Sequence, residues 1–395
     1  MLVSRKIFIF QLFINILLFL IIIIGIYFCF IGGYGSDEDT LPMIYVFETK
    51  LASGRFVSSR FTGNPVAELG IGFLSYFFGS WAANLLTYLF LLLGLVAFYF
   101  SFEKIKFFKE INIFLFLSLT SPILFFDNLE PVDYSWAFFF FSLGFLFLSK
   151  NFFELAILFF GLSIGVRINY TLFVLITILF FEFSSPISFT RRITIFLSTF
   201  IMGGLFYLPV WFDNSFNLSW LTAGRPTDQG PVGLLARFIY KSYIALGYIS
   251  FFIIIYYFYK SFNLLKKIKN IRLLIALGFS NLIIFLWIPA EFSYLQLFLV
   301  IINFIIFKLN NKKIIYFICV GNLISWFIFV SPINVNYVNN EMCAPKNAVS
   351  IDMDFKIEKG FYFKYLSSRE KIKCWVHGNS ERSNRILSGK ALKVD

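Results

Sequence analysis

The stretch IFIFQLFINILLFLIIIIGIYFCFI, residues 7–31, runs for 25 residues without a charged side chain. An apolar run of about 18 residues or more is long enough to cross a bilayer as a helix. The run is longer than the apolar core of a signal peptide, and no small-residue cleavage motif follows it. We therefore expect it to remain in the protein as a first transmembrane helix.

Similar apolar runs recur along the chain. Hydrophobic residues make up 59% of the sequence and charged residues 14%, whereas soluble domains average about 25% charged. This composition excludes an ordinary soluble enzyme and predicts an all-α polytopic membrane protein with about 11 transmembrane helices. The 59 phenylalanines are spread through every span, so we expect them to face lipid. The predicted spans are residues 7–31, 69–100, 111–126, 134–149, 152–166, 170–183, 193–212, 234–259, 272–289, 292–307 and 313–332.

The charges predict which ends of the spans are cytoplasmic. With a cytoplasmic N-terminus, the inner segments carry 16 Lys and Arg, and the outer segments before residue 333 carry 7. This excess follows the positive-inside rule and explains the net charge of +12. Outside the spans there is no basic stripe interleaved with aromatic residues, so we expect no nucleic-acid partner. Carboxylates favour the outer side by 11 to 4, although orientation does not require this, which points to a site there.

The tail has a different composition and divides the chain into a transmembrane domain, 1–332, and a small module, 333–395. The stretch VSIDMDFKI (349–357) alternates apolar and polar residues, and FYFKY (361–365) resumes the alternation after a turn at EKG. This pattern predicts a β-hairpin, with a possible third strand at KIKCWV (371–376). If the β-rich tail is periplasmic, Cys343 and Cys374 can form one disulfide there.

The first outer loop, about 32–68, is long and polar. It opens with GSDEDTLP (35–42), which contains Asp37, Glu38 and Asp39. The next stretch, MIYVFETKLASG (43–54), has apolar residues at helical spacing and ends at a glycine, which predicts a short helix along the membrane surface. The segment RFVSSRFTGNPVAELG (55–70) then returns to the membrane, and its polar residues include Arg55, Arg60, Asn64 and Glu68.

Four later outer loops are shorter and also contain charged residues. They are DNLEPVD with Asp127, Glu130 and Asp133; VRINY with Arg167; DNSFNLSWLTAGRPTDQGPVGLLAR with Arg237; and IPAEFSYL with Glu291.

These loops resemble those of the GT-C superfamily, the membrane-embedded glycosyltransferases that take sugars from polyprenyl-phosphate carriers. Protein mannosyltransferases and lipid A aminoarabinose transferases belong to it. The acidic DED follows the first span, and SGRFVSSRFTGNPVAE resembles the segment G…SR.PG.P..E, with Thr62 in place of the usual proline. GLSIGVRINY is similar to GLALGTR, and PAEFSYL is similar to PAE.RYL. The resemblance covers most of residues 1–310 and implies a GT-C-like fold.

The resemblance also implies roles for the outer residues. It puts the catalytic base in the DED cluster, on Asp39 first and then Asp37, with Glu38 pointing away; solvated loop charges are the alternative. The base takes a proton from the acceptor hydroxyl. Cations must balance the departing lipid phosphate, and the arginine fork suits phosphate oxygens. The candidate phosphate-binding residues are Arg55, Arg60, Arg167 and Arg237, with snorkelling to headgroups as the alternative for Arg167.

The remaining acidic residues have two open interpretations each. Asp127, Glu130 and Asp133 match a second acidic motif that assists acceptor or metal binding, or they form a plain turn around Pro131. Glu291 orients the donor sugar or caps the following helix. Two acidic loops can gather a divalent cation on hard oxygens, but nothing in the sequence requires a metal or another cofactor.

We therefore predict an inverting glycosyltransferase in a bacterial inner membrane. It would transfer one sugar from a polyprenyl-phosphate donor to a glycan, lipid or protein acceptor on the periplasmic side, among membrane lipids. An O-antigen-type polymerase is the alternative enzyme, but it predicts a large arginine-rich outer loop late in the chain. A lipid-linked saccharide flippase is the alternative from another class, and it predicts internal repeats and charges at mid-bilayer. The sequence has no large arginine-rich outer loop late in the chain, no internal repeat and no charges at mid-bilayer.

Overall fold

All regular secondary structure that the computed structural model describes is helical. The described residues are 2–31, 40–54, 56, 58–59, 63–103, 108–183, 187–213, 235, 238–239, 241–243, 245–287 and 292–326. The predicted β-rich tail module lies outside these residues. Within them no strand occurs, which agrees with the all-α prediction for the membrane domain.

Three described helices are long and apolar enough to cross a membrane: α1 (Leu2–Ile31), α4 (Ser80–Phe102) and α13 (Tyr248–Leu265). A fourth span is possible if a bent pair, α5 and α6, counts as one. Shorter apolar helices are α3 (Pro65–Phe78), α7 (Asp133–Ser149), α8 (Phe153–Val166), α9 (Tyr170–Phe180), α14 (Ile271–Trp287) and α15 (Gln296–Lys308). The total of about 11 transmembrane helices remains a prediction.

The other described elements complete the order along the chain. They are α2 (Thr40–Ser53), α5 (Phe108–Thr120), α6 (Pro122–Phe126), η2 (Asp127–Leu129), α10 (Phe189–Phe206), α11 (Leu208–Asp213), η4 (Phe292–Leu295) and α16 (Lys312–Ser325). Helix α2 confirms the helix predicted in the first outer loop.

Three of the predicted spans contain a break in the helix. The 69–100 span divides at Gly79, which has a φ of +83°. Glycine adopts this conformation without steric cost because it has no Cβ. The 111–126 span bends by 91° between α5 and α6, at Ser121 and Pro122. Proline cannot donate the helical hydrogen bond, and its ring disfavours helix in the preceding residue. The 193–212 span divides at Tyr207 into α10 and α11.

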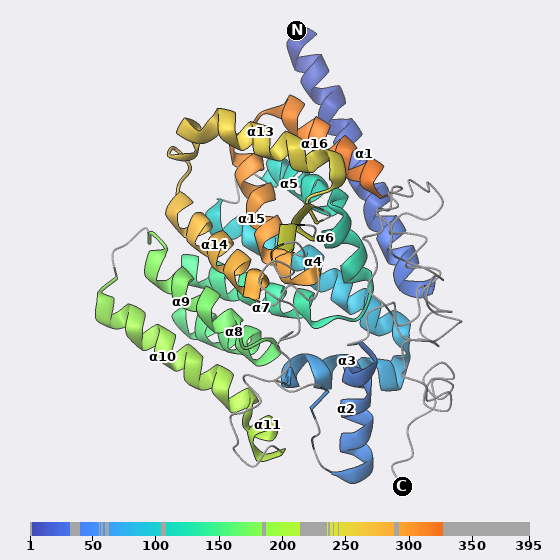
Figure 1. The fold of residues 1–395 in the computed structure, drawn as a ribbon, viewed down its shortest axis with the longest axis vertical. Coiled ribbons are helices and arrows are strands. Elements are labelled where there is room, and N and C mark those ends of the chain that lie inside the picture. The colour runs from blue at the N-terminus through green and yellow to red at the C-terminus, as the bar shows by residue number, and fades with distance from the viewer. Residues whose placement is uncertain are drawn as a thin grey trace.

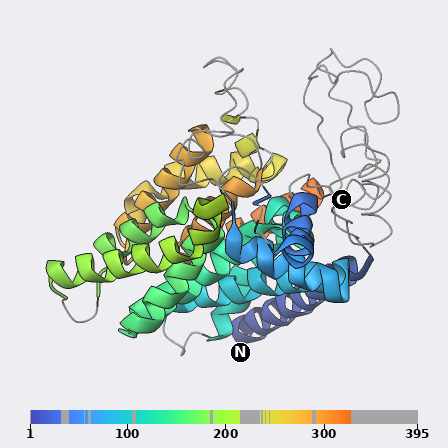
Figure 2. The ribbon, with the colours of Figure 1, turned by 90° about the horizontal axis from the view of Figure 1, so that it is seen from below.

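Helices α4, α7 and α8 pack side by side in the middle of the molecule, and α10 lies against α8 (Figures 1 and 2). Helix α1 runs along one side of the fold, and the α2–α3 pair lies at the opposite end from α13 and α16 (Figure 1).

The expectation that the phenylalanines face lipid is only partly right. Phe98, Phe102, Phe145 and Phe304 pack edge to face or tilted against one another, with Phe98 and Phe145 fully buried. Close aromatic packing supplies the dispersion energy that holds helices together within lipid.

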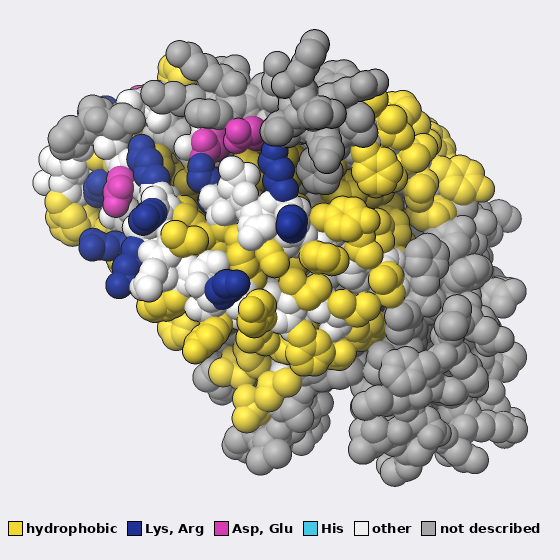
Figure 3. All heavy atoms as spheres, turned by 90° about the horizontal axis from the view of Figure 1, so that it is seen from above, with side chains coloured by type: hydrophobic (Ala, Val, Ile, Leu, Met, Phe, Trp, Pro, Cys, Tyr) yellow, Lys and Arg dark blue, Asp and Glu magenta, His cyan; other side chains and the backbone are white. Residues whose placement is uncertain are grey.

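Contacts between helix ends agree with the predicted alternation of sides. Glu103 after α4 and Lys308 at the end of α15, both assigned to the inner side, form an ion pair. On the side assigned as outer, the Ser293 hydroxyl donates to Asp127 Oδ2 at 2.7 Å. Figure 3 shows Lys and Arg side chains gathered on one part of the face seen from above, while apolar side chains cover much of the rest. The chain is thus an apolar helical protein of membrane type, and its orientation remains a prediction.

Candidate functional site

A buried ion pair forms where α7 begins and α8 ends. The two helices are joined by a tight turn in which Asn151 has a φ of +64°, a conformation that asparagine tolerates. The turn makes them antiparallel neighbours, so the N-terminus of α7 meets the C-terminus of α8. Asp133 is the first residue of α7 and Arg167 caps α8. The helix dipoles favour an anion and a cation at these two ends.

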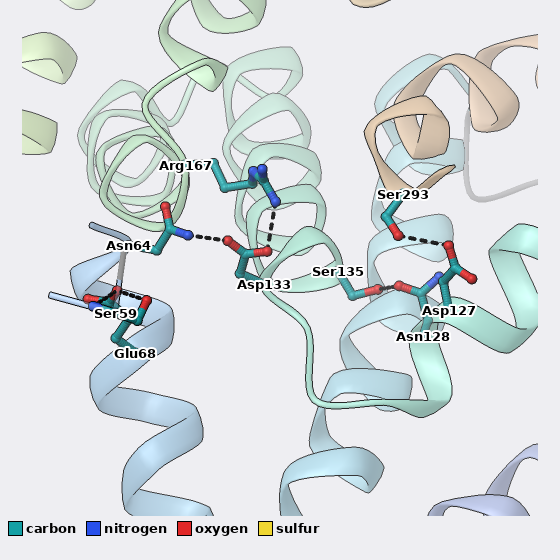
Figure 4. Close-up of polar contacts among 9 residues, drawn as sticks. All are labelled: Ser59, Asn64, Glu68, Asp127, Asn128, Asp133, Ser135, Arg167 and Ser293. Atoms are coloured by element: carbon teal, nitrogen blue, oxygen red, sulfur yellow. Dashed lines mark hydrogen bonds and ion pairs between the residues drawn. The ribbon is translucent and has the colours of Figure 1, made fainter. Parts of the chain in front are cut away.

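The pair also holds the first outer loop. Arg167 Nη1 lies 2.7 Å from Asp133 Oδ1, and Asn64 Nδ2 donates to Asp133 Oδ2 at 2.5 Å (Figure 4). Asn64 is the residue immediately before α3, where the first outer loop re-enters the helical body. The Asp133 side chain is fully buried. One carboxylate therefore ties together three loops that are far apart in the sequence.

Two tyrosines enclose the Arg167 guanidinium. Its Cζ lies 3.7 Å from the ring centroid of Tyr134 on α7 and 4.7 Å from that of Tyr294 on η4. These distances are typical of cation–π contacts, which gain strength when water is excluded. Arg167 is 5% exposed. The fifth outer loop, through Tyr294, thus joins the same cluster.

A second buried carboxylate lies one turn into α3. Glu68 has no exposed surface, and its Oε1 accepts the Ser59 main-chain N–H at 2.9 Å and the Ser59 hydroxyl (Figure 4). Tyr207, also buried, is within electrostatic range of Glu68, Asp133 and Arg167. Both carboxylates and the arginine therefore occupy one region of the fold.

Asp127 takes part in another contact between two outer loops. Asp127 accepts from Ser293, which links the second outer loop to the fifth, and the neighbouring Asn128 accepts from the Ser135 hydroxyl (Figure 4). Glu130 is buried at 5% exposure. Within the described part of the chain, no group of three or more His, Cys, Asp or Glu is placed to hold a metal ion.

Several predicted site residues lie outside the described residues: Asp37, Glu38, Asp39, Arg55, Arg60, Arg237, Glu291, Cys343 and Cys374. Their roles remain predictions.

The structure adds residues to which the sequence assigned no role. Asn64 and Glu68 belong to the NPVAE motif, and Tyr294 belongs to PAEFSYL, so the motifs themselves were the available signal. Lys241, in the segment before α13, is a buried cation at 8% exposure. Ionisable side chains that are buried in membrane proteins are usually functional, so Lys241 is a candidate functional residue.

Comparison with solved structures identifies a related architecture. The chain is similar to the crystal structure of ArnT from Cupriavidus metallidurans in the apo state, with a TM-score of 0.52. The fold is ArnT-like. The match covers 75% of this chain and 59% of that chain, so this chain spans less than two thirds of that structure, and 12% of residues are identical. No family model and no curated protein matches the sequence. The likeness supports the GT-C-like fold implied by the loop motifs, at the level of fold alone.

Proposed function

We propose that this protein is an inverting glycosyltransferase that takes a sugar from a polyprenyl-phosphate donor at the extracytoplasmic membrane face. The observation that carries the proposal is the junction of Asn64, Asp133 and Arg167, where three outer loops meet at one end of an ArnT-like helical fold. A donor with its tail in the bilayer presents its sugar near the membrane surface. Residues at the ends of spans are therefore the ones that can reach it.

The proposed reaction forms one bond to C1 of the sugar and breaks another. The acceptor hydroxyl loses its proton to a carboxylate, Asp39 or Asp37, while its oxygen attacks C1 from the face opposite the phosphate. The bond between C1 and the phosphate oxygen breaks, and its electron pair leaves with the lipid phosphate. Inversion at C1 follows from this single displacement.

Cations on the outer face would stabilise the leaving phosphate. Arg55, Arg60 and Arg237 are the proposed phosphate-binding residues, because guanidinium groups bind phosphate oxygens through two parallel hydrogen bonds. Arg167 is part of the same proposal, but Asp133 already compensates its charge at 2.7 Å. Its proposed part is to present a fixed guanidinium to the donor rather than to supply uncompensated charge.

The acceptor side of the site is proposed for the second and fifth outer loops. Asp127, Glu130 and Glu291 would contact the acceptor or the donor sugar, and the bond between Asp127 and Ser293 joins these two loops. A divalent cation near the acidic loops is compatible with the chemistry, since carboxylate oxygens suit Mg²⁺ and Mn²⁺. The tail module, with a Cys343–Cys374 disulfide, would help to bind the acceptor.

A transfer assay tests this function. Wild-type protein in proteoliposomes would receive radiolabelled polyprenyl-phosphate sugars and a mixture of envelope acceptors, with and without EDTA. We expect donor consumption by the wild type and its loss in Asp39→Asn or Asp37→Asn. Glu103→Gln, a carboxylate change at the opposite helix ends, is the matched control and should remain active. Absence of donor consumption with every sugar would reject the enzyme function, and full activity of both aspartate variants would reject the assigned base.

A further inference from the structure

Four cations gather at the turn between α13 and α14, in a stretch of sequence that contains no carboxylate. They are Lys266, Lys267, Lys269 and Arg272. All four side chains are exposed, and none of them forms an ion pair within the described part of the chain. Like charges on one short turn repel one another, and a bound anion relieves this repulsion. The turn is therefore a surface that favours an anionic partner.

The backbone of this turn is held in place by contacts with the helical body. Ile268 and Asn270, which alternate with the lysines, are buried. Asn270 has a φ of +60°, and its Oδ1 accepts the Glu182 main-chain N–H at 3.1 Å. This bond also brings the exposed Glu182 side chain beside the turn, where four cations outnumber its single charge. An anion that binds here meets an ordered turn, so little conformational entropy is lost on binding.

Two exposed apolar stripes begin at the same turn. On α13, large apolar side chains precede Lys266 at intervals of three or four residues, and they are Phe252, Ile255, Tyr259 and Phe262. On α14, similar side chains follow Arg272 at the same intervals, and they are Ile275, Phe279, Ile283 and Leu286. These intervals place residues on one face of a helix. Each stripe therefore joins a cation to an apolar helix face, and the two helices leave the turn in different directions (Figure 1).

We propose that this turn and its two stripes bind an anionic phospholipid of the cardiolipin class, which carries two phosphates. The phosphates bind the ammonium and guanidinium groups, and the acyl chains lie along the exposed faces of α13 and α14. One lipid with two phosphatidyl units matches four cations and two diverging apolar faces, whereas a lipid with one phosphate engages about half of them. The turn lies on the side of the membrane predicted to be cytoplasmic, so this inference is independent of the proposed function.

The positive-inside rule alone gives a different expectation. It accounts for an excess of Lys and Arg on the inner side as a whole, and it assigns no special role to one turn. If only the total charge matters, three lysines elsewhere on the same side should contribute as much to lipid binding as the three in the turn. Lys150, Lys312 and Lys313 are exposed, lie outside the turn and allow this comparison.

Lipid binding to the purified full-length protein tests the proposal. The protein would be delipidated in a mild detergent and titrated with tetraoleoyl cardiolipin or dioleoyl phosphatidylglycerol, and native mass spectrometry would count the bound lipids. We expect one cardiolipin to bind the wild type at least about tenfold more tightly than phosphatidylglycerol. The triple variant Lys266→Gln, Lys267→Gln and Lys269→Gln should weaken cardiolipin binding by about tenfold or more, because each cation near an anionic headgroup strengthens the attraction.

Two further triple variants serve as controls. Lys150→Gln, Lys312→Gln and Lys313→Gln remove the same charge and should leave the affinity for cardiolipin within about twofold of the wild type. Arginine at positions 266, 267 and 269 keeps the charge of the turn and should retain tight binding. Equal losses in both glutamine variants, full binding by the turn glutamine variant, or loss of binding in the arginine variant would each overturn the proposal. Equal affinity of the wild type for the two lipids would overturn the assignment to a lipid with two phosphates.

Discussion

Replacement of Asp133 with alanine removes the carboxylate that forms an ion pair with the buried Arg167 guanidinium. Loss of one partner of a buried ion pair costs about 3–5 kcal/mol, because the remaining charge has been removed from water without compensation. The exposed fraction of the side chain is 0% for Asp133 and 7% for Arg167, so water cannot readily screen the loss. Asn64, 4% exposed, loses its acceptor in the same variant, which places the expected cost at the upper end, about 5 kcal/mol.

This cost is measurable as a drop in the apparent Tm of the purified protein in detergent. Size-exclusion chromatography after heating to each temperature reports the fraction of protein that remains folded. A destabilisation of 1 kcal/mol shifts Tm by about 2–4 °C in chains of 150–250 residues, and by about half as much in a chain of this length. Asp133→Ala should therefore melt about 5–10 °C below the wild type. Asp133→Ala combined with Arg167→Met removes both charges and should recover most of the loss, since apolar replacement of a buried pair is nearly neutral. A Tm equal to that of the wild type for Asp133→Ala, or a double variant less stable than the single one, would refute the reasoning.

Two further predictions concern packing away from the site and use the same melting assay. Gly247→Val should lower stability by about 1–3 kcal/mol, because φ is +81° there and a Cβ would meet Asn322 Oδ1 at 2.7 Å; an unchanged Tm would show that α13 and α16 adjust freely. Arg192→Met should cost about 1–3 kcal/mol, because the guanidinium donates to three carbonyls at the end of α9. Arg192→Lys, which keeps the charge but not the fork, should recover only part of this loss, and full recovery would argue against the geometry.

Hydropathy located the helices well where they are bounded by polar residues. The predicted spans 134–149 and 152–166 nearly coincide with α7 and α8, because Asp133, Lys150 and Arg167 delimit them. Hydropathy missed the breaks at Gly79 and at Ser121 with Pro122. The hydropathy averaged over a window of residues does not fall where the chain turns without becoming polar. The signals there were local ones, a glycine and a proline, whose backbone preferences act on single residues.

The sequence could single out individual residues of the candidate site but not the contacts between them. The short loop between two spans singled out Arg167, and the acidic motif singled out Asp133; in the structure both side chains are buried. Their pairing depends on the antiparallel packing of α7 and α8, which joins residues separated by 34 positions. Glu68 had a weaker signal, since a carboxylate in the first turn of a helix is common on solvated surfaces. Only the tertiary fold distinguishes a buried carboxylate from an exposed one.

The charges of the buried cluster constrain where a lipid phosphate can be held. Glu68, Asp133 and Arg167 all lie within electrostatic range of Tyr207, so two carboxylates and one guanidinium share this region. Asp133 lies 2.7 Å from Arg167 and compensates its charge, so this ion pair contributes little net charge toward a phosphate. We therefore expect the main share of the proposed phosphate binding from Arg55, Arg60 and Arg237. The contacts of Asp133 with Asn64 and Arg167 join three outer loops, and the reaction proposed for this protein depends on residues of those loops.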